Sequence, residues 1–349
     1  MTAAPYGAVA LQLRCDAVNG AASDEEARRL MARGIERCAA LLGGAKGFVR
    51  TFSGDEVRLV VLPEYFLTGF PLGEPPARWI ARACIAPGGA EYEALGRVAQ
   101  DNGVYLSGNV YETDPHFPGL YFQTSFILAD SGDPVLRYRR LVSMFAPTPH
   151  DVLDRYLDRY GPDALFPVAD TPLGRLACVA SEEILYPEIS RALALRGAEV
   201  LCHSSSEVGS PLATPKNIAK RARAYENMAY VVSANSAGIH GIPFPAMSTD
   251  GWSQVVDFKG QVLAAADADE SMCGNAEIDI ATLRRVRRKP AMTNLLARQR
   301  LELFAACYGG SVYPPNTLLD GDAVTVPGRE HYLETQRRAI DDLVARGIL

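Results

Sequence analysis

Lysine is scarce in this chain. Five lysines stand against thirty arginines, and no lysine occurs between Lys46 and Lys216. An amine that gains and loses a proton during a reaction is therefore absent from this interval, because the arginine guanidinium stays charged at any working pH. An arginine there can supply only positive charge and hydrogen-bond donors.

Long apolar segments and closely paired cysteines are also missing. No segment reaches the roughly eighteen uninterrupted apolar residues of a membrane span, and the first thirty residues lack an apolar run with a basic flank. The seven cysteines are scattered and never occur in a CxxC spacing, which argues against a disulfide framework or a zinc cluster. We therefore expect a cytoplasmic protein with no membrane contact, no metal and no other cofactor.

Basic residues are also fewer than acidic ones in this chain. The 35 lysines and arginines are outnumbered by 41 aspartates and glutamates, so the formal net charge is −6. A protein that binds nucleic acid normally carries a basic patch or a basic balance. The charge balance therefore predicts no nucleic-acid partner.

What the chain does contain is an alternation of strand and helix patterns over 349 residues, enough for one large or two medium domains. Val57–Leu62 is an apolar run broken only by Arg58, which is typical of a strand covered on both faces. Further expected elements are a strand at 7–14, a helix at 24–42 capped by Ser23, a hairpin of 165–168 with 173–180, a basic-faced helix at 216–228, and helices at 293–304 and 330–345.

Ser181 follows the apolar run Leu176–Ala180, and Pro187 can open the next helix six residues later. This order predicts a strand-to-helix elbow with Ser181 at its tip. An elbow lifts one side chain above the sheet and turns the following backbone N–H groups the same way, which suits a nucleophile beside an oxyanion site. The alternative is that Ser181 only caps the helix that follows.

Three polar residues, Glu64, Arg140 and Ser181, stand at the carboxyl ends of predicted strands. Ligands gather at that edge of α/β sheets, so we expect the three side chains to converge on one site. Taken singly, they are equally compatible with a solvated carboxylate, a surface charge and a helix cap.

The surroundings of these residues resemble the nitrilase superfamily of carbon-nitrogen hydrolases. The resemblance rests on five ordered segments: VRLVVLPEYFLTGF, VLRYRRL, GRLACVASEEILYPEISRALALRGAEVL, RARAYENMAYVVSANSAG and STDGWSQVVDFKGQVLAAA. It implies an α/β fold, a four-layer α-β-β-α sandwich, and a homodimer or larger homo-oligomer. We expect a carbon-nitrogen hydrolase-like domain over 1–280 and a C-terminal extension over 281–349 that packs on this core or on a neighbouring subunit.

The resemblance also implies a Glu-Lys-Cys triad that acts on nitriles, amides or carbamoyl groups through a thioester. Glu64 matches the family's glutamate, whereas Arg140 stands at the position of its lysine and Ser181 at that of its cysteine. A serine hydroxyl needs a base to take its proton, and Arg140 cannot act as one, so Glu64 is the expected base. Cys178 lies three residues earlier, within the strand, and is expected to point into the core.

Two functions remain open at this point. In the first, Glu64, Arg140 and Ser181 form a catalytic site for a small amide or related carbonyl compound, with hydrolysis or acyl transfer as the reaction. In the second, the chain is a catalytically silent relative that binds a carbonyl or carboxylate ligand with Arg140 as the anchor. In both, the residues predicted to bind the small molecule are Glu182, which follows Ser181, and His203, Ser204 and Ser205, which follow a strand end.

Overall fold

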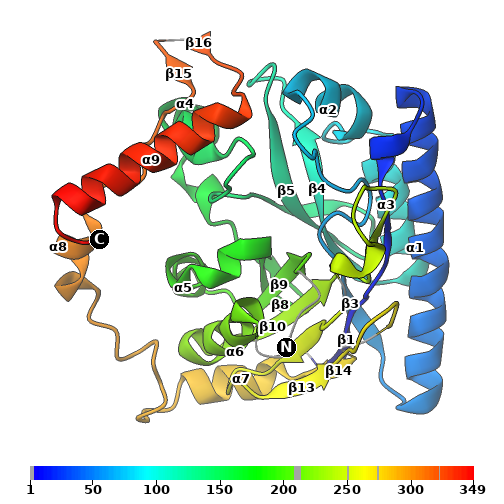
Figure 1. Cartoon of the computed structure of the whole chain (residues 1–349). Coiled ribbons are helices and arrows are strands. Elements are labelled where there is room, and N and C mark those ends of the chain that lie inside the picture. The colour runs from blue at the N-terminus through cyan, green and yellow to red at the C-terminus, as the bar shows by residue number, and fades with distance from the viewer. Residues whose placement is uncertain (1–3, 208–213, 250, 273–274, 322) are drawn as a thin grey trace.

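Two six-stranded sheets form the centre of the protein (Figure 1). The computed structural model describes residues 4–207, 214–249, 251–272, 275–321 and 323–349. In spatial order, the first sheet contains β14 (Ala276–Ile278), β1 (Tyr6–Ala10), β3 (Val57–Val61), β4 (Tyr105–Thr113), β5 (Tyr121–Leu128) and β6 (Pro134–Arg139). The second contains β13 (Val262–Ala265), β12 (Gln254–Val256), β10 (Tyr230–Asn235), β9 (Val200–Ser205), β8 (Gly174–Ala180) and β7 (Ala169–Thr171).

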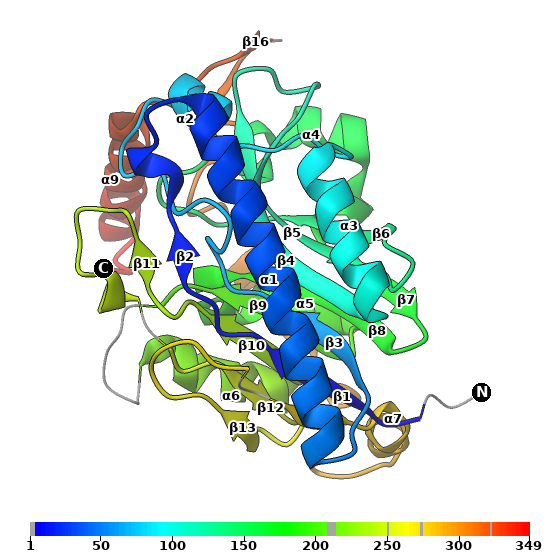
Figure 2. The same ribbon diagram turned by 90° about the vertical axis from the view of Figure 1, so that its right-hand side faces the viewer.

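Helices cover the outer face of each sheet. Helices α1 (Asp24–Phe52) and α3 (Ala90–Asn102) lie on one side of the sheets, and α5 (Pro187–Leu195) and α6 (Pro215–Asn227) lie on the other (Figure 1). Figure 2, viewed from the α1 side, shows α1 and α3 side by side across the first sheet. The layers are thus α-β-β-α, and the predicted four-layer fold is confirmed.

Alternation along the strands explains the layers, because successive side chains point to opposite faces. In β3, Val60 packs in the cluster beneath α1 and α3, whereas Leu59 and Val61 pack between the two sheets. In β8, Val179 packs beneath α5 and α6, whereas Cys178 packs between the sheets. The interpretation of Val57–Leu62 as a strand covered on both faces is therefore confirmed.

Four of the expected elements differ from those observed, and the first is the strand predicted at 7–14, which ends at Ala10 as β1. The helix capped by Ser23 starts as predicted, with the Glu26 N–H 3.1 Å from Ser23 Oγ, but it continues to Phe52 because Ala45 and Val49 still pack on the sheet. The first strand of the hairpin, predicted at 165–168, is observed four residues later as β7 (Ala169–Thr171). A 3₁₀ turn opened by a proline, Pro162–Leu165, overlaps the start of the predicted range.

The predicted helix at 293–304 is wrong. Only a 3₁₀ turn at Leu301–Leu303 and a short α8 (Ala305–Tyr308) form near it. Leu301, Leu303 and Phe304 are all exposed, so this stretch has no buried face to stabilise a helix by packing.

The remaining elements are peripheral to the two sheets. They are β2 (Cys15–Asp16), α2 (Pro76–Ala83), α4 (Leu153–Tyr160), β11 (Ile239–His240), α7 (Ile280–Arg287), β15 (Leu319–Asp320), β16 (Ala323–Val324) and α9 (Arg329–Ala345). The predicted helix at 330–345 corresponds to α9. Leu318, in the C-terminal extension, is buried against Phe117, Phe122 and Tyr156 of the same chain. The domain boundary at 280/281 and packing on a neighbouring subunit stay predictions. In the part of the chain that the structure describes, no helix has the length and apolar character needed to cross a membrane.

Candidate active site

Ser181 stands at a sharp turn between β8 and α5, as the elbow interpretation predicts. Strand β8 ends at Ala180, the 3₁₀ helix η4 covers Ser181–Leu185, and α5 begins at Pro187. The φ angle of Ser181 is 50°, a left-handed conformation that is uncommon for a residue other than glycine. Strain of this kind often marks functional sites because the surrounding structure must hold it in place.

His203 stabilises the elbow by a hydrogen bond to the backbone of Ser181. Its Nε2 lies 2.8 Å from the Ser181 carbonyl oxygen, and its Nδ1 lies 2.8 Å from Ser233 Oγ. A carbonyl oxygen only accepts, so Nε2 carries the proton and Nδ1 accepts from the serine hydroxyl. Burial lowers the pKa of His203 well below its usual value, and the positive charge of Lys220 adds to this shift. His203 is therefore neutral and supports the backbone of the nucleophile position.

Glu183 joins the elbow to the segment that follows β6. Its Oε1 accepts hydrogen bonds from the Leu141 and Val142 N–H groups at 2.6 and 3.1 Å, and its Oε2 accepts from the Tyr138 hydroxyl at 2.7 Å. Burial raises the pKa of Glu183 to about 7, although Arg140 and these donors act to lower it. These hydrogen bonds of Glu183 place the end of β6, and with it Arg140, beside the elbow.

Arg140 is enclosed by protein acceptors. Its Nη1 lies 2.6 Å from Gln123 Oε1 and 3.4 Å from Glu64 Oε1, its Nε lies 2.7 Å from the Val142 carbonyl oxygen, and its Nη2 donates to Glu182. Burial acts to lower the pKa of Arg140, but Glu64 and Glu182 raise it and the net shift is upward. The guanidinium is thus charged, and these four contacts use most of its five N–H donors.

Glu64 is fully buried and only partly satisfied. Its Oε1 accepts from Gln123 Nε2 at 2.6 Å and from Arg140, whereas its Oε2 is buried without a hydrogen-bond partner among the described residues. A buried carboxylate oxygen without a donor costs free energy. Glu64 therefore has one oxygen, Oε1, paired with Arg140 and Gln123, and one oxygen, Oε2, that accepts no hydrogen bond from the described residues.

Lys216 is the residue that the sequence interpretation missed. Its Nζ lies 3.3 Å from Ser181 Oγ and 3.4 Å from Ser205 Oγ. Thr214 caps the first turn of α6, with its Oγ1 3.2 Å from the Asn217 N–H, and this cap fixes the helix start that presents Lys216. Burial lowers the pKa of Lys216, whereas Glu64 and Glu207 act in the opposite direction.

A second lysine lies one turn further along α6. Lys220 is completely buried, with its Nζ 2.8 Å from Asn217 Oδ1, and burial lowers its pKa to about 7. Both lysines of the predicted basic face therefore point inward. The sequence contained one signal for these inward-pointing side chains: two of its only five lysines, Lys216 and Lys220, lie four residues apart at the start of one helix and therefore on one face of it.

The structure brings most of the predicted residues into two hydrogen-bonded groups, which are joined where the Glu64 N–H donates to the Ser205 carbonyl oxygen at 3.1 Å. Arg140 contacts Glu64 and Glu182, and Lys216 contacts Ser181 and Ser205. The remaining two predicted binding residues use their polar atoms within the protein: His203 as described above, and Ser204 by donating to the Leu62 carbonyl oxygen at 2.7 Å. Contact of any of these side chains with a ligand stays a prediction.

Cys178 is buried between the sheets, as the sequence analysis expected. Its Sγ lies 3.8 Å from Ser107 Oγ, and burial raises its pKa well above the usual value. A thiol of this kind is inert as a nucleophile. Ser181 is therefore the nucleophile candidate in this part of the structure.

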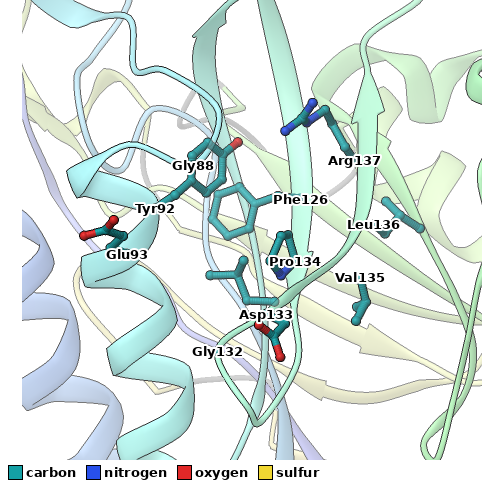
Figure 3. A pocket seen from close by; sticks show the side chains of 11 residues that line it. Gly88, Tyr92, Glu93, Phe126, Gly132, Asp133, Pro134, Val135, Leu136 and Arg137 are labelled. Carbon is teal, nitrogen blue, oxygen red and sulfur yellow. The ribbon is translucent and has the colours of Figure 1, made fainter. Parts of the chain in front are cut away.

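Two cavities differ in their relation to the elbow. One, of about 700 Å³, is lined by Val142 and Tyr186 near the elbow and by 310–313 of the C-terminal extension. Another, of about 470 Å³, lies between α3 and the β5–β6 hairpin, and Figure 3 shows Tyr92 and Phe126 on its wall. Neither of these two cavities is lined by a predicted site residue. Within the described residues, no three His, Cys, Asp or Glu side chains are grouped as metal ligands would be.

The α-β-β-α sandwich is the fold that the sequence motifs indicated. The sequence model described as carbon-nitrogen hydrolase matches residues 30–288. The chain therefore belongs to the carbon-nitrogen hydrolase family of the nitrilase superfamily.

Three curated relatives illustrate the family. The chain is 29% identical over 266 residues to the nitrilase and fragile histidine triad fusion protein NitFhit of Caenorhabditis elegans, covering 74% of this chain and 57% of that protein. It is 25% identical over 293 residues to a formamidase of Bradyrhizobium diazoefficiens, covering 83% and 79%. It is 29% identical over 246 residues to a nitrilase of Pyrococcus abyssi, covering 70% and 85%.

Solved structures share the fold. A carbon-nitrogen hydrolase from Helicobacter pylori G27 matches with a TM-score of 0.65 at 23% identity, covering 87% of this chain and 98% of that one. An amidase from Nesterenkonia sp. AN1, showing covalent addition of the acetamide moiety of fluoroacetamide at the active site cysteine, matches with a TM-score of 0.60 at 20% identity, covering 88% and 97%.

Proposed function

We propose that this protein acts on a small amide or related carbonyl compound, by hydrolysis or acyl transfer, through a covalent ester on Ser181. The observation that carries the proposal is the strained elbow, on which Ser181 Oγ lies 3.3 Å from the amine of the half-buried Lys216. A hydroxyl beside a titratable group is the arrangement that nucleophilic catalysis requires. Glu64 and Arg140 supply the charges of the surrounding network.

The names of the relatives support an amide as the substrate class. Formamidase, nitrilase and amidase are the activities given for proteins similar to this chain, and one amidase carries a covalent acetamide group on its cysteine. A serine at the corresponding motif position would form an ester in place of a thioester. The ester would then be hydrolysed by water or transferred to another acceptor.

Simple ligand binding anchored by Arg140 has less support. Four of the five N–H groups of Arg140 already donate to protein acceptors, so a ligand carboxylate that binds in the bidentate mode would have to displace Glu64, Glu182 or Gln123. Displacing a paired buried carboxylate leaves it uncompensated, which is costly.

Mass spectrometry of the intact protein tests the proposal. After incubation with p-nitrophenyl acetate or acetamide, we expect an added acetyl mass that peptide mapping assigns to Ser181. Ser181→Ala should lose the adduct, whereas Ser206→Ala should retain it, because Ser206 pairs with Ser236 at 3.0 Å and not with Lys216. No adduct on the wild-type protein, or an adduct that survives in Ser181→Ala, would contradict the proposal.

We also propose a homodimer or larger homo-oligomer, as the family resemblance implies. Light scattering should then give a mass of at least two chains of 37.7 kDa. A mass equal to one chain over the micromolar range would remove this part of the proposal.

A further inference from the structure

We propose that Lys216 is the catalytic base that takes the proton from Ser181 Oγ, so that the two residues act as a serine–lysine pair. The inference rests on the proposed function, because it needs Ser181 as the nucleophile. It departs from the expectation that Glu64 takes this proton. The argument starts from which groups can reach Ser181.

Lys216 is the group within reach. A base must lie within about 2.6–3.2 Å of the proton's heavy atom, and this distance is often longer before a substrate is bound. The Nζ–Oγ distance of 3.3 Å is just beyond this range, as expected for a protein without bound substrate. Among the described residues, no hydrogen bond joins Glu64 to Ser181, and Arg140 and Gln123 both hold Glu64 Oε1.

Lys216 also lies where a neutral amine can exist. It is the second residue of α6, and its Nζ contacts two hydroxyl groups, those of Ser181 and Ser205. Charged groups surround it from several elements: Glu64 after β3, Glu207 after β9, Arg140 after β6 and Glu182 in η4. The carboxylates favour the ammonium form, whereas burial and Arg140 favour the neutral amine, and the pKa of Lys216 is lowered overall.

The step balances without a further reactant. Neutral Lys216 Nζ takes the hydroxyl proton while Ser181 Oγ forms a bond to the carbonyl carbon, which gives a tetrahedral anion and an ammonium. The ammonium returns the proton to the leaving nitrogen as the C–N bond breaks, leaving an ester on Ser181 and a neutral Lys216. Water then attacks the ester by the same route and releases the acid. Glu64 stabilises the ammonium that forms between these transfers.

The pair explains how a serine and an arginine can occupy the elbow network together. A serine hydroxyl is far less acidic than a thiol and needs a base close to it, and a guanidinium cannot be that base. Lys216 provides the titratable amine from the start of α6. Arg140 at the end of β6 remains a fixed cation that pairs with Glu64 and Glu182.

Rapid-mixing kinetics with p-nitrophenyl acetate tests the assignment. Lys216→Met should slow formation of the acetyl-Ser181 adduct by about 10²–10⁴-fold, the range for loss of a general base, and should remove the rise of the rate with pH that deprotonation of the amine produces. Lys216→Arg should be equally impaired because it keeps the charge without the base. In Lys216→Ala, added methylamine or ethylamine should restore part of the rate.

A control variant and a check of folding accompany this experiment. Lys259→Met is the matched control, because Lys259 is exposed beside the Phe258 ring, and it should acylate at the wild-type rate. Circular dichroism and thermal unfolding should be used to check that each variant is folded. If the wild-type protein forms the adduct and Lys216→Met forms it equally fast with the same pH profile, Lys216 is not the base but the proposed function stands. If the wild-type protein forms no adduct, both proposals are overturned.

Discussion

Arg140→Met is expected to lower the free energy of unfolding by about 3–5 kcal/mol, the usual loss when one member of a buried ion pair is removed. Arg140 lies between Glu64, which is fully buried, and Glu182, and it also donates to Gln123 and to the Val142 carbonyl oxygen. Without the guanidinium, Glu64 remains as an uncompensated buried carboxylate. Urea unfolding at neutral pH, followed by circular dichroism, measures the loss.

A double variant separates the charge effect from lost packing. Arg140→Met combined with Glu64→Gln should be more stable than Arg140→Met alone, because the unpaired carboxylate is gone. Arg196→Met is the control: its pair with Asp163 is exposed at the surface and should contribute less than about 1 kcal/mol. A loss below about 1 kcal/mol for Arg140→Met would contradict the view that Arg140 neutralises the buried carboxylate.

Lys220→Met is expected to stabilise the protein by about 3–5 kcal/mol at pH 7, with the gain shrinking as the pH rises. Burial lowers the pKa of Lys220 from 10.5 to about 7, so the unfolded chain binds a proton there more tightly than the folded protein does. This penalty is complete below about pH 7 and disappears by about pH 10.5. Methionine has a similar length and carries no proton, so it removes the penalty.

Chemical unfolding of both proteins between pH 6 and pH 9 measures this difference. Wild-type stability should rise relative to Lys220→Met across this range. Lys289→Met, in which an exposed lysine is replaced, should run parallel to the wild-type protein. A Lys220→Met variant that is less stable than the wild type at pH 7 would show that the ammonium is paired in the folded protein.

Both predictions concern buried cationic side chains where the chemistry is expected: Arg140 stabilises the fold by pairing with Glu64, whereas Lys220 lowers stability. Arg140 and Lys220 are buried beside the elbow, and Lys216 is half-buried there. Natural proteins keep such unfavourable groups mainly where function needs them. The stability cost of burying Lys220 is therefore a further reason to regard this region as the functional site.

The sequence alone was sufficient for the features that depend on local pattern. The apolar run Val57–Leu62 predicted a strand buried on both faces, the Ser23 cap predicted the start of α1, and the order of apolar run, serine and proline predicted the elbow at Ser181. These features depend on side-chain alternation and capping among near neighbours in the chain. The ordered motifs added the family, and with it the four-layer fold.

Only the tertiary structure decided which groups meet at the site. The pattern at 216–228 predicted a basic-faced helix, but it could not show that Lys216 turns inward to Ser181, 35 residues earlier, or that Gln123 and Glu182 enclose Arg140. The direction of a long flexible side chain depends on which surfaces pack around its helix, and these come from distant segments. Local periodicity contains no information about such partners, because burial and contact between distant residues arise only when the sheets and helices assemble.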